Sequence, residues 1–199
     1  AFTVCFMVWM MLAVVGIPVK EQLGLSETEF GILAATPVLS GSLVRVPLGI
    51  WTDRYGGRIV FFVLMLLCVP AIFMMQYADQ FWQFLLIGLV MGLAGGSFSV
   101  GTPYVARWFP KHQQGMAMGV FGAGNAGSAV NKFLAPALIA YGTWHFVPTV
   151  YAVIMLGTAI VFWFTSYHDK SHLVSSSVTL REQLALLKDP GVLRYSQYY

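Results

Sequence analysis

Charged side chains are scarce in this sequence, where they make up only 10% of 199 residues. A soluble domain of this size needs far more polar surface, because charged residues normally cover the exterior in water. Hydrophobic residues reach 58%, and the mean hydropathy of +0.73 agrees with that excess. The composition therefore excludes an ordinary soluble domain and predicts a protein whose solvent is largely lipid.

Cysteine is also rare, with Cys5 and Cys68 each alone in an apolar stretch. Neither belongs to a CxxC or Cys/His cluster, so we expect no disulfide, no metal site and no cofactor. Dense basic runs are missing as well, since the 11 Lys and Arg residues lie mainly in predicted loops. The net charge of +3 is therefore no sign of nucleic-acid binding and serves instead as a guide to membrane topology.

Apolar stretches recur along the chain, and each has about 20 residues, enough to cross a hydrocarbon core of about 30 Å. In lipid, a helix satisfies its own backbone, so the predicted fold class is all-α, a polytopic transmembrane helix bundle. No signal peptide precedes the first stretch, so we expect the true start of the protein to lie before Ala1. The predicted helices cover residues 2–17, 28–51, 59–77, 83–107, 114–140 and 146–167.

Lysine and arginine are distributed unevenly between the two sides of this predicted bundle. The turns after the second and fourth helices and the tail hold most of them, whereas the opposite side offers Lys20. Positively charged loops tend to stay in the cytoplasm. We therefore predict a multi-pass protein of the cell (inner or plasma) membrane with a cytoplasmic N-terminus. Six helices with both ends inside form half of a common transporter plan.

Beyond the predicted bundle of residues 1–167, the tail becomes more polar. Residues 168–190 are predicted to be a cytoplasmic linker with a short amphipathic helix, because Thr179 and Glu182 have the spacing of a capping box before a run of leucines. Residues 191–199 are typical of the first turns of a seventh span. The chain is therefore expected to be a fragment that lacks a C-terminal six-helix half.

The segment of residues 49–58 joins the second and third predicted helices and reads G-I-W-T-D-R-Y-G-G-R. Its paired glycines allow a tight turn, and its arginines are attracted to an anionic leaflet. The segment resembles the G-x-x-x-D-R-x-G-G-R loop of the major facilitator superfamily, which implies two inverted three-helix repeats. The resemblance also implies a gating role for Asp53, Arg54, Arg58 and Arg107. Because Asp53 and Arg107 end helices at the same face, we predict that they lie close together.

Glycines crowd the fourth and fifth predicted helices, many of them four residues apart. Small residues on one stripe allow close helix packing, which explains most of them. The run of residues 119–127 is denser than packing needs and contains one amide, Asn125. This run is similar to the nitrate motif of the nitrate/nitrite porters (NarK type) in that superfamily. The resemblance implies that Asn125 contacts the anion, together with Gly122, Gly124 and a wall residue, Phe98.

Arg45 is the most informative single residue, because a guanidinium within a span costs about 3 kcal/mol on insertion scales. All eight Asp and Glu residues fall in predicted loops, at helix ends or in the tail, so no acidic partner is expected inside a span. A planar cation of this kind suits a planar anion bound by forked hydrogen bonds. Arg45 also matches the arginine that binds nitrate in the second helix of the porter family, and snorkelling to the surface is the alternative.

Two further residues complete the candidate site. Tyr199 is matched by the same resemblance to a substrate-facing tyrosine of the seventh helix, with an interfacial tyrosine as the alternative. Lys132 is identified from the predicted repeat, in which the second helix corresponds to the fifth. Arg45 lies 17 residues after Thr28 and Lys132 lies 17 residues after Gly115, so the two cations occupy equivalent positions. A desolvated lysine can exchange its proton, whereas arginine stays charged. Lys132 is therefore a candidate for proton coupling, and a structural lysine in an anion exchanger is the alternative.

These features together predict a secondary transporter of a small inorganic anion, nitrate or nitrite, that works by alternating access and is not an enzyme. An organic-anion carrier is an alternative, because Arg45 could also bind a carboxylate. A non-transporting membrane sensor or scaffold is another. A proton-driven drug antiporter is disfavoured, since no arginine lies near Gly88. The expected partners are the anion, protons, the lipid bilayer and the missing half, and no nucleic acid is expected.

Overall fold

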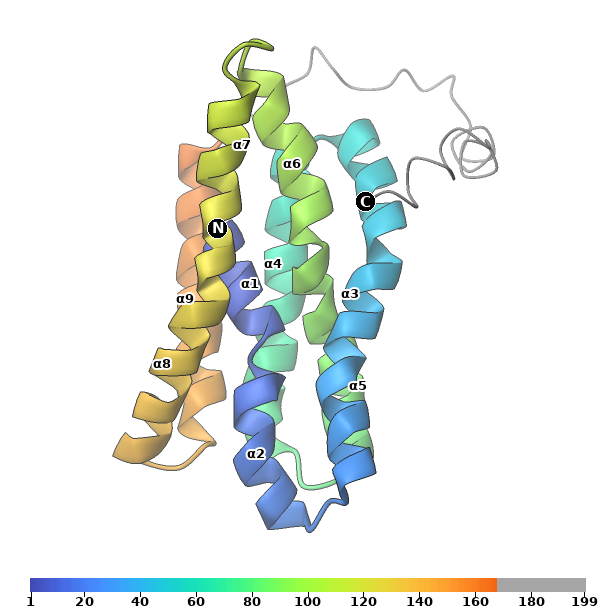
Figure 1. Ribbon diagram of the computed structural model, residues 1–199, viewed down its shortest axis with the longest axis vertical. Coiled ribbons are helices and arrows are strands. Elements are labelled where there is room, and N and C mark those ends of the chain that lie inside the picture. Colours follow the sequence, from blue (N-terminus) through green and yellow to red (C-terminus); the bar gives the residue numbers. More distant parts are fainter. Residues whose placement is uncertain (168–199) are drawn as a thin grey trace.

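The computed structural model describes residues 1–167, and the regular structure in that part of the chain is entirely helical (Figure 1). The predicted all-α fold class is therefore confirmed. Four of the long helical rods carry more than one label, and three of these are interrupted near their middles. The rods are α1 (Phe2–Trp9) with α2 (Leu12–Leu23); α3 (Glu27–Tyr55); α4 (Gly57–Met74) with η1 (Met75–Tyr77); α5 (Phe81–Met91) with η2 (Gly92–Gly96) and α6 (Ser97–Trp108); α7 (Gln114–Gly122) with η3 (Ala123–Ala126) and α8 (Gly127–Tyr141); and α9 (Phe146–Thr165).

Five of these rods are long and apolar enough to cross a membrane. The glycine-rich rod formed by α7, η3 and α8 is not among them, although it packs against both α1 and α9 as part of the bundle. The other five satisfy the length and hydropathy expected of a span. Their bounds are Phe2–Leu23, Glu27–Tyr55, Gly57–Tyr77, Phe81–Trp108 and Phe146–Thr165.

Several helix ends differ from those predicted from the sequence. The first rod ends at Leu23 instead of residue 17, because Gly24 provides a left-handed cap with φ of 62°. Helix α3 continues to Tyr55 instead of residue 51 and stops at Gly56, which also has a positive φ, of 86°. At its start, Ser26 and Glu29 form a capping box. Residues 53 and 54 of the glycine-containing motif thus belong to a helix and not to a loop.

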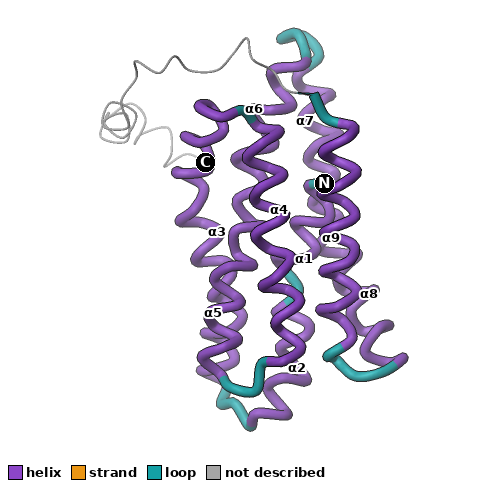
Figure 2. The backbone as a smooth tube through the Cα atoms, turned by 180° about the vertical axis from the view of Figure 1, so that it is seen from behind, coloured by secondary structure: helices purple, strands orange, loops and turns teal. Residues whose placement is uncertain are grey.

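Three rods are interrupted near their middles, which the sequence did not predict. The first breaks between α1 and α2 (Figure 2), the fourth passes through η2, and the fifth passes through η3. Glycine is common in η2, and η3 contains Gly124 and lies between Gly122 and Gly127. Glycine weakens α-helical structure by its backbone freedom. Helix α1 contacts η2 and η3, so the irregular backbone of three rods meets around α1.

Glycines allow the closest of these contacts. A Cβ on Gly127 would lie within 2.9 Å of the Met7 backbone nitrogen, and one on Gly95 would lie 2.5 Å from the Trp9 ring. Such distances leave no room for a side chain, so α1 approaches the fourth and fifth rods because glycine is present there. The packing interpretation of these two glycines is confirmed.

The face that carries the predicted site is formed by three rods. In Figure 1, α1 and α2 lie between α3 on one side and the rod of α7, η3 and α8 on the other. Helices α4 and α9 pack against each other behind them. The first rod therefore connects α3, which carries Arg45, to the rod that carries Asn125 and Lys132.

Candidate functional site

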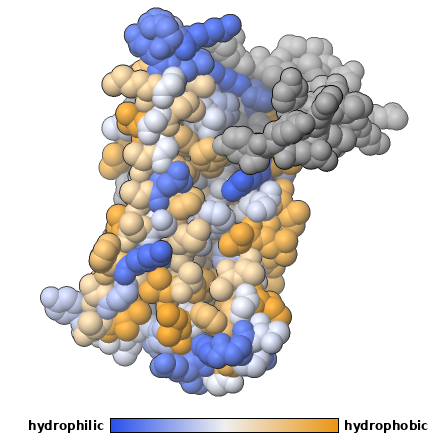
Figure 3. All heavy atoms as spheres, in the orientation of Figure 1, coloured by the Kyte–Doolittle hydropathy of each residue, from blue (hydrophilic) through white to orange (hydrophobic). Residues whose placement is uncertain are grey.

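Arg45 lies on the open face of α3, where it is exposed. Within residues 1–167, its guanidinium takes part in no hydrogen bond, salt bridge or cation–π contact. Its neighbours Leu43 and Val46 are also exposed, with 69% and 42% of their surfaces accessible. Figure 3 shows hydrophilic groups isolated among hydrophobic ones in the middle of this face. The arginine therefore stands in apolar surroundings with its donors free.

Asn125 lies at nearly the same depth in the bundle as Arg45. Arg45 is ten residues before Tyr55, the end of α3, which places it about 15 Å along the axis. Asn125 is 11 residues after Gln114, the start of α7, or about 16 Å from the same end of the bundle. Asn125 is exposed, and its side chain makes no hydrogen bond to the described residues. Two exposed donor groups, neither of them hydrogen-bonded to residues 1–167, thus lie at one depth of the bundle.

An aromatic cluster lies beside Asn125. The Phe98 ring is centred 5.9 Å from both the Phe2 and Phe121 rings, and the Phe2 and Phe121 rings stack at 4.5 Å. Phe98 is half-buried, so part of its surface is free to form a wall. Aromatic rings are more weakly hydrated than polar groups, so this cluster is suited to be an apolar wall of the candidate site.

The two predicted site glycines have different surroundings. Gly124 is buried, and a Cβ there would overlap the Phe2 ring, which favours a packing role for it. Gly122 is half-exposed, and a Cβ there would meet no described atom within 4 Å. Of the pair, only Gly122 has open space beside its backbone among the described residues.

Lys132 is exposed on α8, seven residues after Asn125. Seven residues are about two helical turns, so the two side chains share a face and Lys132 lies about 10 Å further from the α7 end. Its ammonium makes no salt bridge or hydrogen bond to residues 1–167. The structure therefore places Arg45 and Asn125 at one depth, and it places Lys132 on the same side of its rod as Asn125 at a different depth.

The predicted gating residues gather where α3 meets α4 and α6. Arg107 donates from Nη2 to Asp53 Oδ1 over 2.6 Å, so the predicted proximity of these two residues is confirmed. Arg58 Nη2 donates to the Trp163 carbonyl oxygen over 2.5 Å, and its guanidinium lies 4.4 Å from the Trp163 ring. Arg54 is exposed beside the Tyr55 ring. Contacts from this motif thus join α3 to α6 and α4 to α9.

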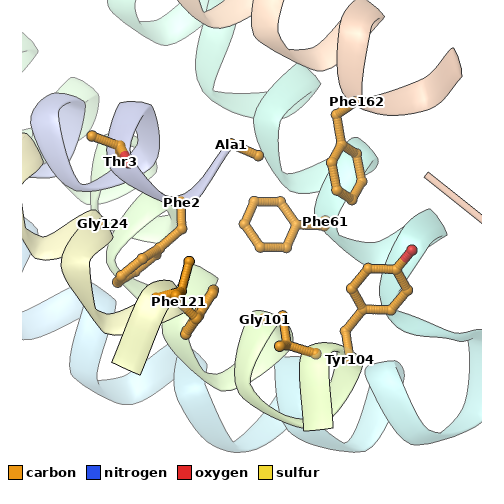
Figure 4. Close-up of a pocket in the computed structure, with 11 residues that line it drawn as sticks. Ala1, Phe2, Thr3, Phe61, Gly101, Tyr104, Phe121, Gly124 and Phe162 are labelled. Carbon is orange, nitrogen blue, oxygen red and sulfur yellow. The ribbon is translucent and has the colours of Figure 1, made fainter. Parts of the chain in front are cut away.

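A cavity of about 270 Å³ opens beside the first residue of the chain (Figure 4). Its lining is aromatic and aliphatic, including Phe61, Phe121 and Phe162. Gly124 is the one predicted site residue that lines it, and no charged side chain does. Such a lining would not offset the cost of desolvating an inorganic anion, so this cavity is a poor anion site.

Sequence reasoning missed a buried polar network next to the site. Asn131 Nδ2 donates to the Met10 carbonyl oxygen over 2.8 Å, and Asn131 Oδ1 accepts from the Tyr151 hydroxyl at 2.8 Å. Trp9 Nε1 donates to the Pro37 carbonyl oxygen, also over 2.8 Å. An amide beside Lys132 and a tyrosine in the middle of a span were the available signals, since buried polar groups need partners.

Two other predictions concern residues outside this geometry. Among residues 1–167, no group of three or more His, Cys, Asp and Glu side chains is arranged to hold a metal ion. Cys5 and Cys68 are both buried and free. Tyr199, the linker of residues 168–190 and the start of a seventh span at 191–199 lie outside the described residues.

Membrane-length helical rods, three of them interrupted, with an arginine inside a span that has no partner among residues 1–167, are typical of the secondary-transporter class. The Major Facilitator Superfamily matches residues 1–195, and the chain belongs to this family. The resemblance inferred from the loop of residues 49–58 is therefore confirmed, as is the expectation that the chain belongs to a transporter and not to an enzyme.

The chain is similar to three curated proteins named for nitrate or nitrite. It is 39% identical to the probable nitrate/nitrite antiporter NarK1 of Thermus thermophilus, over 100% of this chain and 47% of that protein. It is 31% identical to a nitrite extrusion protein of Bacillus subtilis, over 88% and 45%. It is 33% identical to the probable nitrate transporter NarT of Staphylococcus carnosus, over 80% and 41%. The chain spans about half the length of the curated relatives it matches.

Proposed function

We propose that this chain is part of a nitrate or nitrite transporter that works by alternating access and binds its anion at Arg45 and Asn125. The observation that carries the proposal is an intramembrane arginine, free of partners among the described residues, at the same depth as an unpaired amide. The names of the similar curated proteins support the choice of anion.

The chemistry of the site favours a small planar anion. A guanidinium offers parallel donors in one plane, which fit two oxygens of nitrate or nitrite at once. Asn125 would add an amide donor, and Gly122 would allow close approach to the backbone. Phe98 would exclude water on one side and so strengthen these hydrogen bonds. A cation substrate is disfavoured, because Arg45 and Lys132, the charged residues that lie away from the ends of the described rods, are both basic.

Alternating access requires contacts that form and break at one end of the bundle. The Asp53–Arg107 ion pair and the Arg58 contact to Trp163 suit that task, because each joins two different rods at one end. The side chain of Asp53 is 42% exposed, so the pair would contribute about 0–1 kcal/mol. That amount can shift an equilibrium between two conformations without determining the fold.

Coupling to protons would be provided by Lys132. A lysine on the open face, about 10 Å from the level of Arg45, could take up a proton together with the anion and release it on the other side. This arrangement favours anion/proton symport. Exchange of nitrate for nitrite is the second candidate, and the name of the Thermus relative, an antiporter, favours it.

Transport by the full-length protein in liposomes tests the proposal. We expect saturable uptake of nitrate or nitrite. Each of the two anions should inhibit uptake of the other. Formate and lactate, which are small organic anions, should compete weakly. Competition by an organic anion at equal concentration would favour the organic-anion carrier, and an absence of flux of any anion tested would overturn the transporter proposal.

A further inference from the structure

The break in the first rod has no local cause in the sequence. Helix α1 ends at Trp9 and α2 begins at Leu12, and the residues around the break contain no proline, glycine or serine. Sharp breaks in helices otherwise arise where a side chain or water inserts into the backbone hydrogen-bond ladder. The cause must therefore be sought in another part of the chain.

The backbone hydrogen bonds show where the ladder is interrupted. The Val14 N–H donates to the Met11 carbonyl over 3.0 Å and not to the Met10 carbonyl, which lies four residues before it. The Met10 carbonyl accepts from the Ala13 N–H at 3.2 Å, and it also accepts from Asn131 Nδ2 at 2.8 Å. The amide of Asn131 thus occupies a backbone acceptor at the point where α-helical bonding stops.

Asn131 is well suited to hold this break. It is 1% exposed, and its Oδ1 accepts from the Tyr151 hydroxyl of α9, which fixes the amide with Nδ2 toward Met10. Tyr151 is itself fully buried. Polar groups in a lipid-embedded bundle have few other partners, so the two hydrogen bonds hold α1, α8 and α9 together.

The residue before the break is held from the other side. Trp9 Nε1 donates to the Pro37 carbonyl oxygen of α3 over 2.8 Å, and the Trp9 ring packs where Gly41 and Gly95 leave room. Successive residues of the first rod are therefore hydrogen-bonded to α3 and to α8. Helix α3 carries Arg45, and α8 carries Lys132. Asn125 lies in η3, the turn that leads into α8.

We infer that Asn131 is a positioning residue, which holds the first rod in its broken form and thereby fixes the distance between Arg45 and Asn125. In the broken form, the Met10 carbonyl accepts the Asn131 amide while Trp9 stays bonded to the Pro37 carbonyl. Loss of the Asn131 bond should let the first rod straighten and so change the separation of α3 and the fifth rod. The inference rests on the proposed anion site for its functional consequence. The structural part, that Asn131 holds the break, stands independently of the substrate.

The test compares Asn131→Leu and Tyr151→Phe with Thr149→Val in the full-length protein. Leucine has a similar size but donates nothing to Met10, and phenylalanine removes the hydroxyl that orients the amide. Thr149 also lies on α9, and its hydroxyl is hydrogen-bonded to Gln76 at 3.0 Å, away from the break. The control thus removes one hydrogen bond from the same helix.

Two readouts are measured for each variant. The first is the dissociation constant for nitrate, expected to rise about tenfold in Asn131→Leu, equivalent to about 1.4 kcal/mol, and by less in Tyr151→Phe. The second is the rate at which N-ethylmaleimide alkylates Cys5, with every other cysteine replaced. Cys5 is fully buried in α1, so a rod released at Met10 should expose it and react faster.

The outcomes separate the inference from the proposed function. Faster Cys5 alkylation and weaker nitrate binding in both network variants, with Thr149→Val unchanged, support the inference. Wild-type Cys5 alkylation in Asn131→Leu and Tyr151→Phe overturns it, whatever happens to nitrate. If the unmodified protein binds no nitrate, the proposed function fails, and the alkylation rates still decide the role of Asn131.

Discussion

Arg107 and Asp53 are joined by a 2.6 Å hydrogen-bonded ion pair although 54 residues separate them in the sequence. The pair connects α6 to the last turn of α3, beyond the glycine-rich contacts that hold the middle of these rods together. The opposite end of α3 has a second pair, in which Lys20 lies 2.6 Å from Glu27. Glu27 is 87% exposed and close to Lys20 in sequence, so this second pair is a natural reference for the first.

Replacing Asp53 by Asn should weaken the contact between α3 and α6 at this end of the bundle. The loss of an exposed ion pair costs about 0–1 kcal/mol, so we expect normal expression and thermal stability but a transport rate lowered several-fold. Anion uptake by proteoliposomes measures the rate. Glu27→Gln is the matched control and should transport normally. Equal rates for Asp53→Asn and the unmodified protein would remove the gating role.

Replacing Arg45 by Lys should abolish anion uptake or reduce it at least tenfold, because lysine keeps the charge but loses the planar fork. Arg181→Lys makes the same chemical change in the predicted linker of residues 168–190 and should have little effect. Uptake at matched expression decides between them. Uptake by Arg45→Lys within about twofold of the unmodified protein would contradict a bidentate site.

Replacing Lys132 by Gln should separate coupling from binding. If Lys132 carries the proton, the variant loses accumulation of nitrate driven by a pH gradient but still exchanges internal for external anion. Lys111→Gln, in the exposed turn before α7, controls for the loss of one positive charge. Should Lys132→Gln still concentrate nitrate in response to the gradient, Lys132 is structural and exchange becomes the better description.

The sequence predicted the parts of the site that depend on residue type. Arg45 was identifiable because a charge in an apolar span is costly wherever its neighbours lie, and Asp53 and Arg107 because both lie at helix ends on one side. The break at Met10 was not predictable, since its partner Asn131 lies 121 residues further along the chain. The end of the first rod was misplaced because the cap, Gly24, lies beyond polar residues that are typical of a loop.

The glycines of the fifth rod show the same limit. In the sequence, Gly122 and Gly124 belong to one dense run, and the resemblance assigns both to the substrate. In the structure, Gly124 packs under the Phe2 ring, whereas a Cβ on Gly122 would meet no described atom within 4 Å. Which glycine meets a neighbour depends on the helical phase relative to α1, and the 3-10 turn of η3 changes that phase.

This difference gives a last prediction, in which one methyl group is added at three positions of the fifth rod. Gly127→Ala should lower thermal stability, because its Cβ would meet the Thr3 carbonyl and the Met7 nitrogen, both backbone atoms that cannot rotate away. Overpacking of this kind costs about 1–3 kcal/mol. Gly124→Ala should destabilise less, since the Phe2 ring can turn.

Gly122→Ala should behave in the opposite way. Its Cβ meets no described atom within 4 Å, so the unfolding temperature in detergent should stay close to that of the unmodified protein. Nitrate uptake should nevertheless fall, because the methyl group would project from the open face three residues before Asn125 and obstruct the backbone approach that the proposed site needs. Unfolding temperature and uptake are measured on the same preparations of all three variants. Normal uptake by Gly122→Ala would place the anion away from this turn, and a loss of stability equal to that of Gly127→Ala would mean that Gly122 is a packing glycine after all.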